Sequence, residues 1–157
     1  MLVIASDHAG FSLKAEILKH LDEKGVPYED LGTCDCITSV DYPDYGLLVA
    51  EAVSRGTHEK GIIVCGTGIG ISIAANKVPG VRAALCTDSY MAKMSREHND
   101  ANVLALGARV IGAGLAADIV DSWLSASFLG GRHKTRVDKF TSIEDKYSIK
   151  NVKQEVR

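Results

Sequence analysis

Short runs of branched apolar residues alternate along this chain with longer segments of helical periodicity, and this alternation constrains the fold most. The runs are Leu2 to Ala5, Pro27 to Leu31, Gly61 to Cys65, Val81 to Cys86 and Asn102 to Leu106. Strands with this composition are typical of a parallel sheet buried between two layers of helices. The pattern therefore predicts an α/β fold, a three-layer αβα sandwich.

The segments between the runs supply the helices of the two outer layers. One apolar stripe comprises Leu13, Ile17, Leu18 and Leu21, and a second comprises Leu47, Leu48, Val49, Ala52 and Val53. Helical spacing of this kind lets a helix cover one face of a sheet. Further helices are expected over Ile69 to Lys77, Ser89 to Arg96 and Ala113 to Ser125, and helical spacing continues after Arg136.

The chain length of 157 residues fits a single domain. We expect that domain to span residues 1–147, followed by a polar C-terminal extension over 148–157. The formal net charge of −2 offers no broad attraction for nucleic acid. The sequence shows neither a secretory signal nor an apolar stretch long enough to cross a membrane, so we expect a cytoplasmic protein without a membrane partner. Four scattered cysteines do not suggest a disulfide framework.

Polar residues follow several of the predicted strands at the point where each strand ends. In an open parallel sheet, ligands bind beyond the carboxyl ends of the strands, so these residues should converge. After the first strand come Asp7 and His8, after the third Cys65, Gly66, Thr67, Gly68, Ile69 and Gly70, and after the fourth Thr87 and Asp88.

The segment that begins at Cys65 has the features of an anion-binding loop. Gly66, Gly68 and Gly70 allow backbone N–H groups to turn toward a negatively charged oxygen just before a helix. The same positive field favours the thiolate form of Cys65, which makes it a candidate base or nucleophile. Two plainer interpretations stay open, namely a buried cysteine that only packs and glycines that only allow close strand-to-helix packing.

Two further groups of polar residues have both a functional and a plain interpretation. His98 is either a candidate acid–base group or an exposed histidine that is favoured at a helix C-terminus. Arg132 and Arg136 are four residues apart and share a face if they are helical, which suits a phosphate monoester or simply a solvated surface. Cys34 and Cys36 lack the further ligands that a metal site needs, so no metal is expected.

Five motifs together resemble the ribose-5-phosphate isomerase B family, which includes galactose-6-phosphate and allose-6-phosphate isomerases. They are SDHAGF at residues 6–11, DYPDY at 41–45, CGTGIGISIAANK at 65–77, EHNDANVLALGARV at 97–110 and GGRHKTRV at 130–137. The resemblance implies a Rossmann-like sheet of five parallel strands and a homodimer or dimer of dimers. It also implies a small-molecule sugar phosphate as substrate and no cofactor.

The resemblance also implies roles for individual residues. Cys65 would be the base that moves a proton between C1 and C2, supported by Thr67, and the backbone from Gly66 to Gly70 would hold the enediolate. His98 would donate the proton that opens the furanose ring, with Asp7 as a hydroxyl-binding helper. The residues expected to contact substrate hydroxyls are Asn99 and Tyr42, and those expected to hold the phosphate are His8, Arg109, Arg132 and Arg136. These sites are assembled across a dimer interface, and His133 lies beside them without an assigned role.

The expected function is therefore the interconversion of D-ribose 5-phosphate and D-ribulose 5-phosphate through a cis-enediolate. Allose 6-phosphate and galactose 6-phosphate are alternative substrates, because a six-carbon sugar needs only a slightly longer pocket. A non-catalytic module that binds a sugar phosphate or a nucleotide is the alternative from another class. Thiol redox chemistry is disfavoured, because Cys65 has no Cys-x-x-Cys partner.

Overall fold

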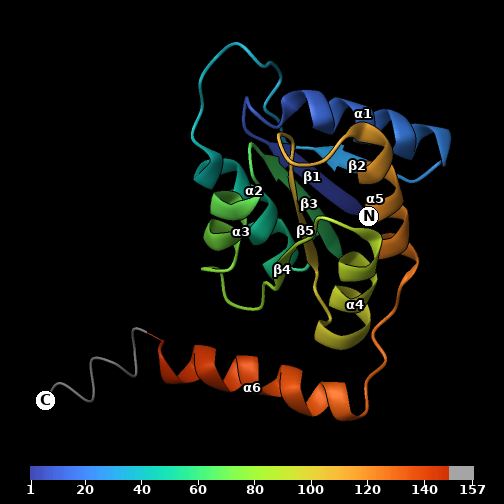
Figure 1. Cartoon of the computed structure of the whole chain (residues 1–157). Helices are drawn as coiled ribbons and strands as arrows, with labels where there is room; N and C mark the ends of the chain where they lie inside the picture. The colour runs from blue at the N-terminus through green and yellow to red at the C-terminus, as the bar shows by residue number, and fades with distance from the viewer. Residues whose placement is uncertain (149–157) are drawn as a thin grey trace, which may run out of the picture.

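Five parallel strands form a single central sheet in the computed structural model, which describes residues 1–148 (Figure 1). The strands run in the order β2-β1-β3-β5-β4. Their bounds are β1 Leu2–Ser6, β2 Tyr28–Asp30, β3 Lys60–Cys65, β4 Ala83–Leu85 and β5 Val103–Gly107. The long strands β1, β3 and β5 lie in the middle and are almost completely buried. This arrangement confirms the predicted parallel sheet.

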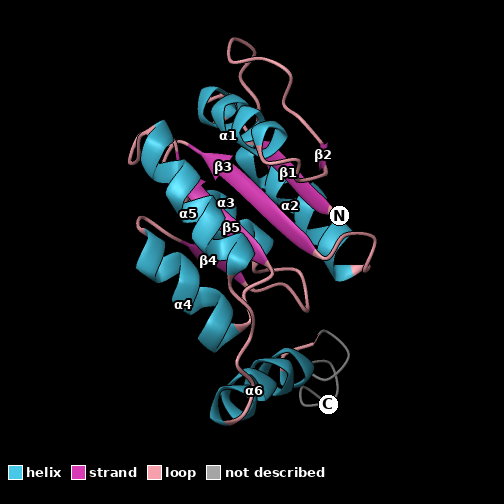
Figure 2. Cartoon of the chain, turned by 90° about the vertical axis from the view of Figure 1, so that its right-hand side faces the viewer, coloured by secondary structure: helices cyan, strands magenta, loops and turns pink. Residues whose placement is uncertain are grey.

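Helices cover both faces of the sheet. Their bounds are α1 Phe11–Glu23, α2 Tyr42–Ser54, α3 Ile69–Ala75, α4 Ser89–Asn99, α5 Ala113–Ser125 and α6 Arg132–Lys146. Alternate strand residues such as Ile4 and Val64 pack with α1, α4 and α5, whereas Val3 and Ile63 pack with α2 and α3. The three-layer sandwich is confirmed, and α6 lies outside it, near the C-terminal end of α4 (Figures 1 and 2).

Two details differ from the sequence-based expectations. Leu47 and Leu48 are 44% and 45% exposed, because α2 turns Val49 and Val53 rather than its whole apolar run toward the sheet. The second difference is the extent of β4, an edge strand of only Ala83–Leu85, which is shorter than the predicted run from Val81 to Cys86.

An ionic contact ties α1 to α5 across the surface. The Asp121 carboxylate accepts hydrogen bonds from His20 Nε2 at 2.8 Å and from Lys24 Nζ at 2.9 Å. Burial acts to raise the pKa of Asp121, but these two partners outweigh it, so the pKa lies below its ordinary value. His20 is therefore a partly buried partner in this contact.

Among residues 1–148, no helix combines the length and the apolarity that crossing a membrane requires. The predicted polar extension falls almost wholly on residues 149–157, which lie outside the described part of the chain.

Candidate active site

The strand order places a crevice between the carboxyl ends of β1 and β3. Strand β2 pairs with one edge of β1 and strand β3 pairs with its other edge, so the direction in which strands are added reverses at β1. The neighbours β1 and β3 therefore mark a topological switch point. Ligands of open α/β sheets bind at such a point. A pocket of about 450 Å³ opens there. Its walls comprise Asp7, His8, Ala9, Tyr42, Cys65, Gly66, Thr67, Ile69, Gly70 and Arg109.

Cys65 is the last residue of β3, and its side chain forms part of the pocket wall. The residue is 5% exposed, and its Sγ atom accepts a hydrogen bond from the backbone N–H of Gly68 at 3.1 Å. It also packs in the apolar cluster beneath α2 and α3. The thiol is thus shielded from bulk water yet borders the pocket, which suits a base that acts on a bound molecule.

The glycines of the loop after Cys65 allow other groups to come close to its backbone. Gly68 has a φ of +76°, and a Cβ atom there would lie 3.0 Å from the carbonyl oxygen of Leu106. A Cβ atom at Gly70 would lie 2.6 Å from the ring of Tyr42. The loop therefore packs tightly, as one sequence interpretation proposed, and it also lines a pocket.

Asp7 and His8 are positioned by backbone groups on either side of the pocket. A carboxylate oxygen of Asp7 accepts a hydrogen bond from the N–H of Gly10 at 2.8 Å, at the start of α1. The Nδ1 atom of His8 lies 3.2 Å from both the N–H and the carbonyl oxygen of Val40, so its partner depends on the tautomer. Val40 belongs to the loop before α2 and thereby fixes the His8 ring at the pocket.

A buried lysine that was not singled out from the sequence is hydrogen-bonded to the loop before α2. Lys14 is 1% exposed, and its ammonium group donates to both carboxylate oxygens of Asp30, at 2.6 and 2.8 Å, and to the carbonyl oxygen of Thr33 at 2.9 Å. Its place beside Leu13 and Ile17, on the buried face of α1, was the available signal. Ala9 also lines the pocket without having been singled out.

A second group of candidate residues lies away from this pocket within the same chain. His98 and Asn99 end α4, whereas Arg132 and Arg136 belong to the first turns of α6. None of these four residues lines the switch-point pocket, so the structure of one chain does not bring all the predicted site residues together. Both arginines are exposed, and neither guanidinium forms an ion pair with another residue of the described chain.

Thr87 and Asp88 do not converge on the pocket, contrary to the expectation from their position after β4. The strand β4 is at the edge of the sheet, beyond β5, and is therefore remote from the switch point. The Asp88 side chain instead accepts a hydrogen bond from the N–H of Met91 at 2.8 Å and caps α4. Nearby Cys86 is buried in the core, and this burial raises its pKa to about 11.

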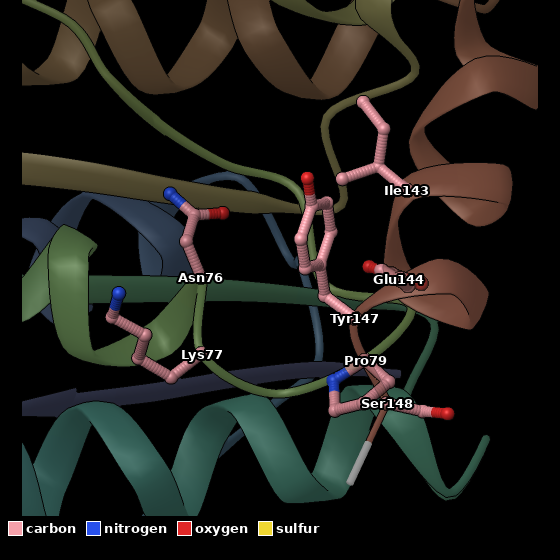
Figure 3. A pocket seen from close by; sticks show the side chains of 7 residues that line it. All are labelled: Asn76, Lys77, Pro79, Ile143, Glu144, Tyr147 and Ser148. Carbon is pink, nitrogen blue, oxygen red and sulfur yellow. The ribbon is translucent and has the colours of Figure 1, made fainter. Parts of the chain in front are cut away.

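A larger cavity, of about 960 Å³, lies elsewhere and lacks the predicted chemistry. It opens between the end of α3 and the C-terminal part of α6 (Figure 3). Its walls comprise Asn76, Lys77, Pro79, Ile143, Glu144, Tyr147 and Ser148. The Glu144 carboxylate there accepts a hydrogen bond from the N–H of Gly80, which joins α6 to the loop before β4. No candidate base or nucleophile from the sequence lies in this cavity.

No group of three or more histidine, cysteine, aspartate or glutamate side chains among residues 1–148 is arranged to hold a metal ion. Cys34 and Cys36 are exposed free thiols in the loop before α2.

Comparison with known proteins decides the family. A model of the Ribose/Galactose Isomerase family matches residues 2–140. This chain belongs to that family. It is 52% identical over 145 residues to ribose-5-phosphate isomerase B of Escherichia coli, covering 92% of this chain and 97% of the relative. The chain is therefore an aldose–ketose isomerase by descent, with the resemblance seen in its motifs confirmed.

Solved structures of the family share the whole fold. Ribose-5-phosphate isomerase B of Clostridium thermocellum is 63% identical, with a TM-score of 0.91, and the match covers 94% of this chain and 99% of that one. The enzyme of Mycoplasma genitalium, solved with bound ribulose-5-phosphate, is 43% identical, with a TM-score of 0.87 and coverage of 92% and 95%. A D-erythrulose-4-phosphate isomerase of Pectobacterium atrosepticum is 44% identical over 138 residues, covering 88% of this chain and 91% of that protein.

Proposed function

We propose that this protein interconverts D-ribose 5-phosphate and D-ribulose 5-phosphate, with Cys65 as the base. The observation that carries the proposal is the Sγ atom of Cys65 at the wall of the switch-point pocket, beside a loop of backbone N–H groups. Membership of the Ribose/Galactose Isomerase family supports the reaction class.

In the proposed isomerisation, the Cys65 thiolate removes the proton from C2 of the open-chain aldose. The electron pair of the C2–H bond forms the C1=C2 bond, and the carbonyl oxygen O1 becomes the oxyanion of a cis-enediolate. A proton moves from O2 to O1, and the Cys65 thiol then returns its proton to C1 as the C2 carbonyl forms. C1 thus receives a proton from the Cys65 thiol, either the one removed from C2 or one that the thiol has exchanged with solvent, and the base is regenerated.

The loop that follows Cys65 would stabilise the enediolate. Backbone N–H groups between Gly66 and Gly70 are fixed by close packing, because Gly68 and Gly70 lie against Leu106 and Tyr42. Donors that are held in place before the reaction stabilise charge as it develops at the oxygen, and so favour the transition state over the substrate. The Thr67 hydroxyl would assist from the same loop.

Ring opening needs a second acid–base pair. We assign His98 as the acid that gives its proton to the ring oxygen O4 as the C1–O4 bond breaks. The C1 hydroxyl then passes its proton to Asp7, whose other oxygen is held by Gly10. Tyr42 and Asn99 would contact the remaining hydroxyls.

The substrate phosphate would be held by His8, Arg109, Arg132 and Arg136. The three arginines are exposed and have no carboxylate partner among residues 1–148, so their guanidinium groups are free to bind a phosphate. His8 and Arg109 lie at the pocket, but Arg132 and Arg136 lie on α6 outside the sandwich. We therefore propose a homodimer in which α4 and α6 of one subunit complete the pocket of the other.

Subunit mixing tests this shared site. Cys65→Ala and His98→Asn proteins should each be almost inactive, but unfolding and refolding them together gives hybrid dimers with one fully native site. Half of the dimers are hybrids and half of their sites are native, so activity should recover to about 25% of the native value. No recovery, with hybrids demonstrated by native mass spectrometry, would place Cys65 and His98 of the same subunit in one site.

A substrate comparison tests the reaction itself. We expect kcat/KM to be highest for ribose 5-phosphate when it is compared with allose 6-phosphate, galactose 6-phosphate and D-erythrulose 4-phosphate, and to be unchanged by a chelator. The last compound is included because of the Pectobacterium relative. Binding of these phosphates without turnover, and without exchange of the C2 proton with solvent, would indicate a non-catalytic binding module.

A further inference from the structure

His133 makes a close ring contact with His98, the residue proposed as the ring-opening acid. The two imidazole rings lie parallel, with an interplanar angle of 4° and centroids 4.2 Å apart. His98 is in the last turn of α4 and His133 in the first turn of α6, so the stack is part of the contact between these two helices. His133 is 6% exposed, although the residues on either side of it are exposed.

The surroundings of His133 favour its neutral form. Arg132 Nε, which can only donate, lies 3.5 Å from His133 Nε2, so the Nε2 atom presents its lone pair and the ring proton belongs on Nδ1. That Nδ1 atom is buried and has no hydrogen-bond partner among the described residues. No carboxylate therefore stabilises a positive charge on this ring by direct contact.

Most of the charged groups around the His133 ring lower its pKa. Burial lowers the pKa of His133 below its ordinary value, and the positive charges of His98, Arg132 and Arg136 lower it further. Glu97 on α4 acts in the opposite direction, but it also lies 3.7 Å from Lys93. Most of the groups that surround His133 thus disfavour a positive charge on its ring.

We propose that His133 is a positioning residue for His98: its neutral ring stacks on His98 and fixes the orientation of that ring. A flat π face stacks favourably on a cationic ring, whereas two cationic imidazoles at this separation would repel each other. The inference rests on the proposed role of His98 in ring opening, and it assigns His133 no contact with the reacting atoms.

Three variants separate stacking from simple space filling. His133→Phe keeps a flat, uncharged ring, His133→Leu fills the site without such a face, and Lys134→Ala is the control for a change in the same turn of α6. Misorienting an acid by a fraction of its side-chain length costs about tenfold to a hundredfold in rate. We expect kcat on ribose 5-phosphate to fall by this factor for His133→Leu, to change little for His133→Phe and to stay unchanged for Lys134→Ala.

A second readout distinguishes a positioning role from a structural one. Ribulose 5-phosphate has no hydroxyl placed to close a five-membered ring on its C2 carbonyl, so exchange of its C1 proton with D₂O requires Cys65 but no ring opening. We expect His133→Leu to retain this exchange, and its KM for ribose 5-phosphate, while kcat falls. Equal losses of exchange and isomerisation, or a raised KM alone, would mean that His133 only holds α6 and its arginines.

Failure of the inference is distinguishable from failure of the proposed function. If the native protein shows neither exchange nor isomerisation, the proposed function is wrong. If it shows both, but the His133→Phe and His133→Leu proteins behave alike, only the stacking role is wrong. Nitrogen-15 NMR of the native protein supplies a test that needs no variant. His133 should be neutral and protonated on Nδ1 at pH 7, and a doubly protonated His133 would overturn the inference.

Discussion

Replacing Gly68 with alanine tests how tightly the loop after Cys65 is packed. Gly68 has a φ of +76°, a conformation that costs an L-residue about 1 to 2 kcal/mol. The new Cβ atom would also lie 2.9 Å from the carbonyl carbon and 3.0 Å from the carbonyl oxygen of Leu106, which cannot shift easily because it belongs to the central strand β5. Overpacking of this kind costs about 1 to 3 kcal/mol more.

Gly80 provides the matched control. Its φ of +80° is almost the same, but a Cβ atom there would meet nothing within 4 Å. Gly80→Ala should therefore show only the conformational cost of about 1 to 2 kcal/mol, and Gly68→Ala about 2 to 5 kcal/mol in all. Urea unfolding at one fixed protomer concentration measures both, since the stability of an oligomer depends on concentration. Equal destabilisation by the two substitutions would refute the argument from close packing.

Three further predictions concern charge, thiol reactivity and phosphate binding. The pKa of Asp121 is lowered in the folded state, so its contribution to stability is present above its unfolded pKa of about 3.9 and is lost as pH falls through the folded pKa. Urea unfolding should therefore show that Asp121→Asn lowers the free energy of unfolding by less than about 1 kcal/mol at pH 7 and leaves it unchanged near pH 2. At pH 8, iodoacetamide should alkylate Cys34 and Cys36 but spare Cys86, whose pKa is about 11, and rapid labelling of Cys86 on peptide mass spectrometry would contradict its burial. Arg132→Ala should raise KM far more than it lowers kcat, because phosphate contacts are shared by the ground and transition states, and a fall in kcat alone would contradict the assignment.

The sequence predicted the layers of the fold better than the local exposure of single residues. Runs such as Ile62 to Val64 are apolar on both faces because helices cover both sides of β3, so composition alone identified this strand. The apolar run around Leu47 and Leu48 was misassigned to the core. A helix turns about 100° per residue, so a run of adjacent apolar residues spans more than one face, and only the packing of α2 determines which face is buried.

The candidate site was predictable in part, for a topological reason. Residues after β1 and β3 meet because these strands are neighbours, and the motifs around Asp7 and Cys65 already indicated both. The order of the strands in the sheet differs from their order along the sequence. The position of Asp88 after β4, far from the switch-point pocket, could therefore not be predicted. The stack of His98 on His133 likewise depends on where α6 returns to α4, which periodicity does not determine.

The central claim is that the sulfur of Cys65 moves the proton between C1 and C2, and solvent exchange with a Cys65→Ser protein tests it most directly. Incubated with ribulose 5-phosphate in D₂O, the native protein should incorporate deuterium at C1, and Cys65→Ser should lose nearly all of this exchange. Calorimetry should show that the variant still binds the sugar phosphate, while a Cys34→Ser control exchanges at the native rate. Undiminished exchange by Cys65→Ser would contradict the account, because another group would then be the base.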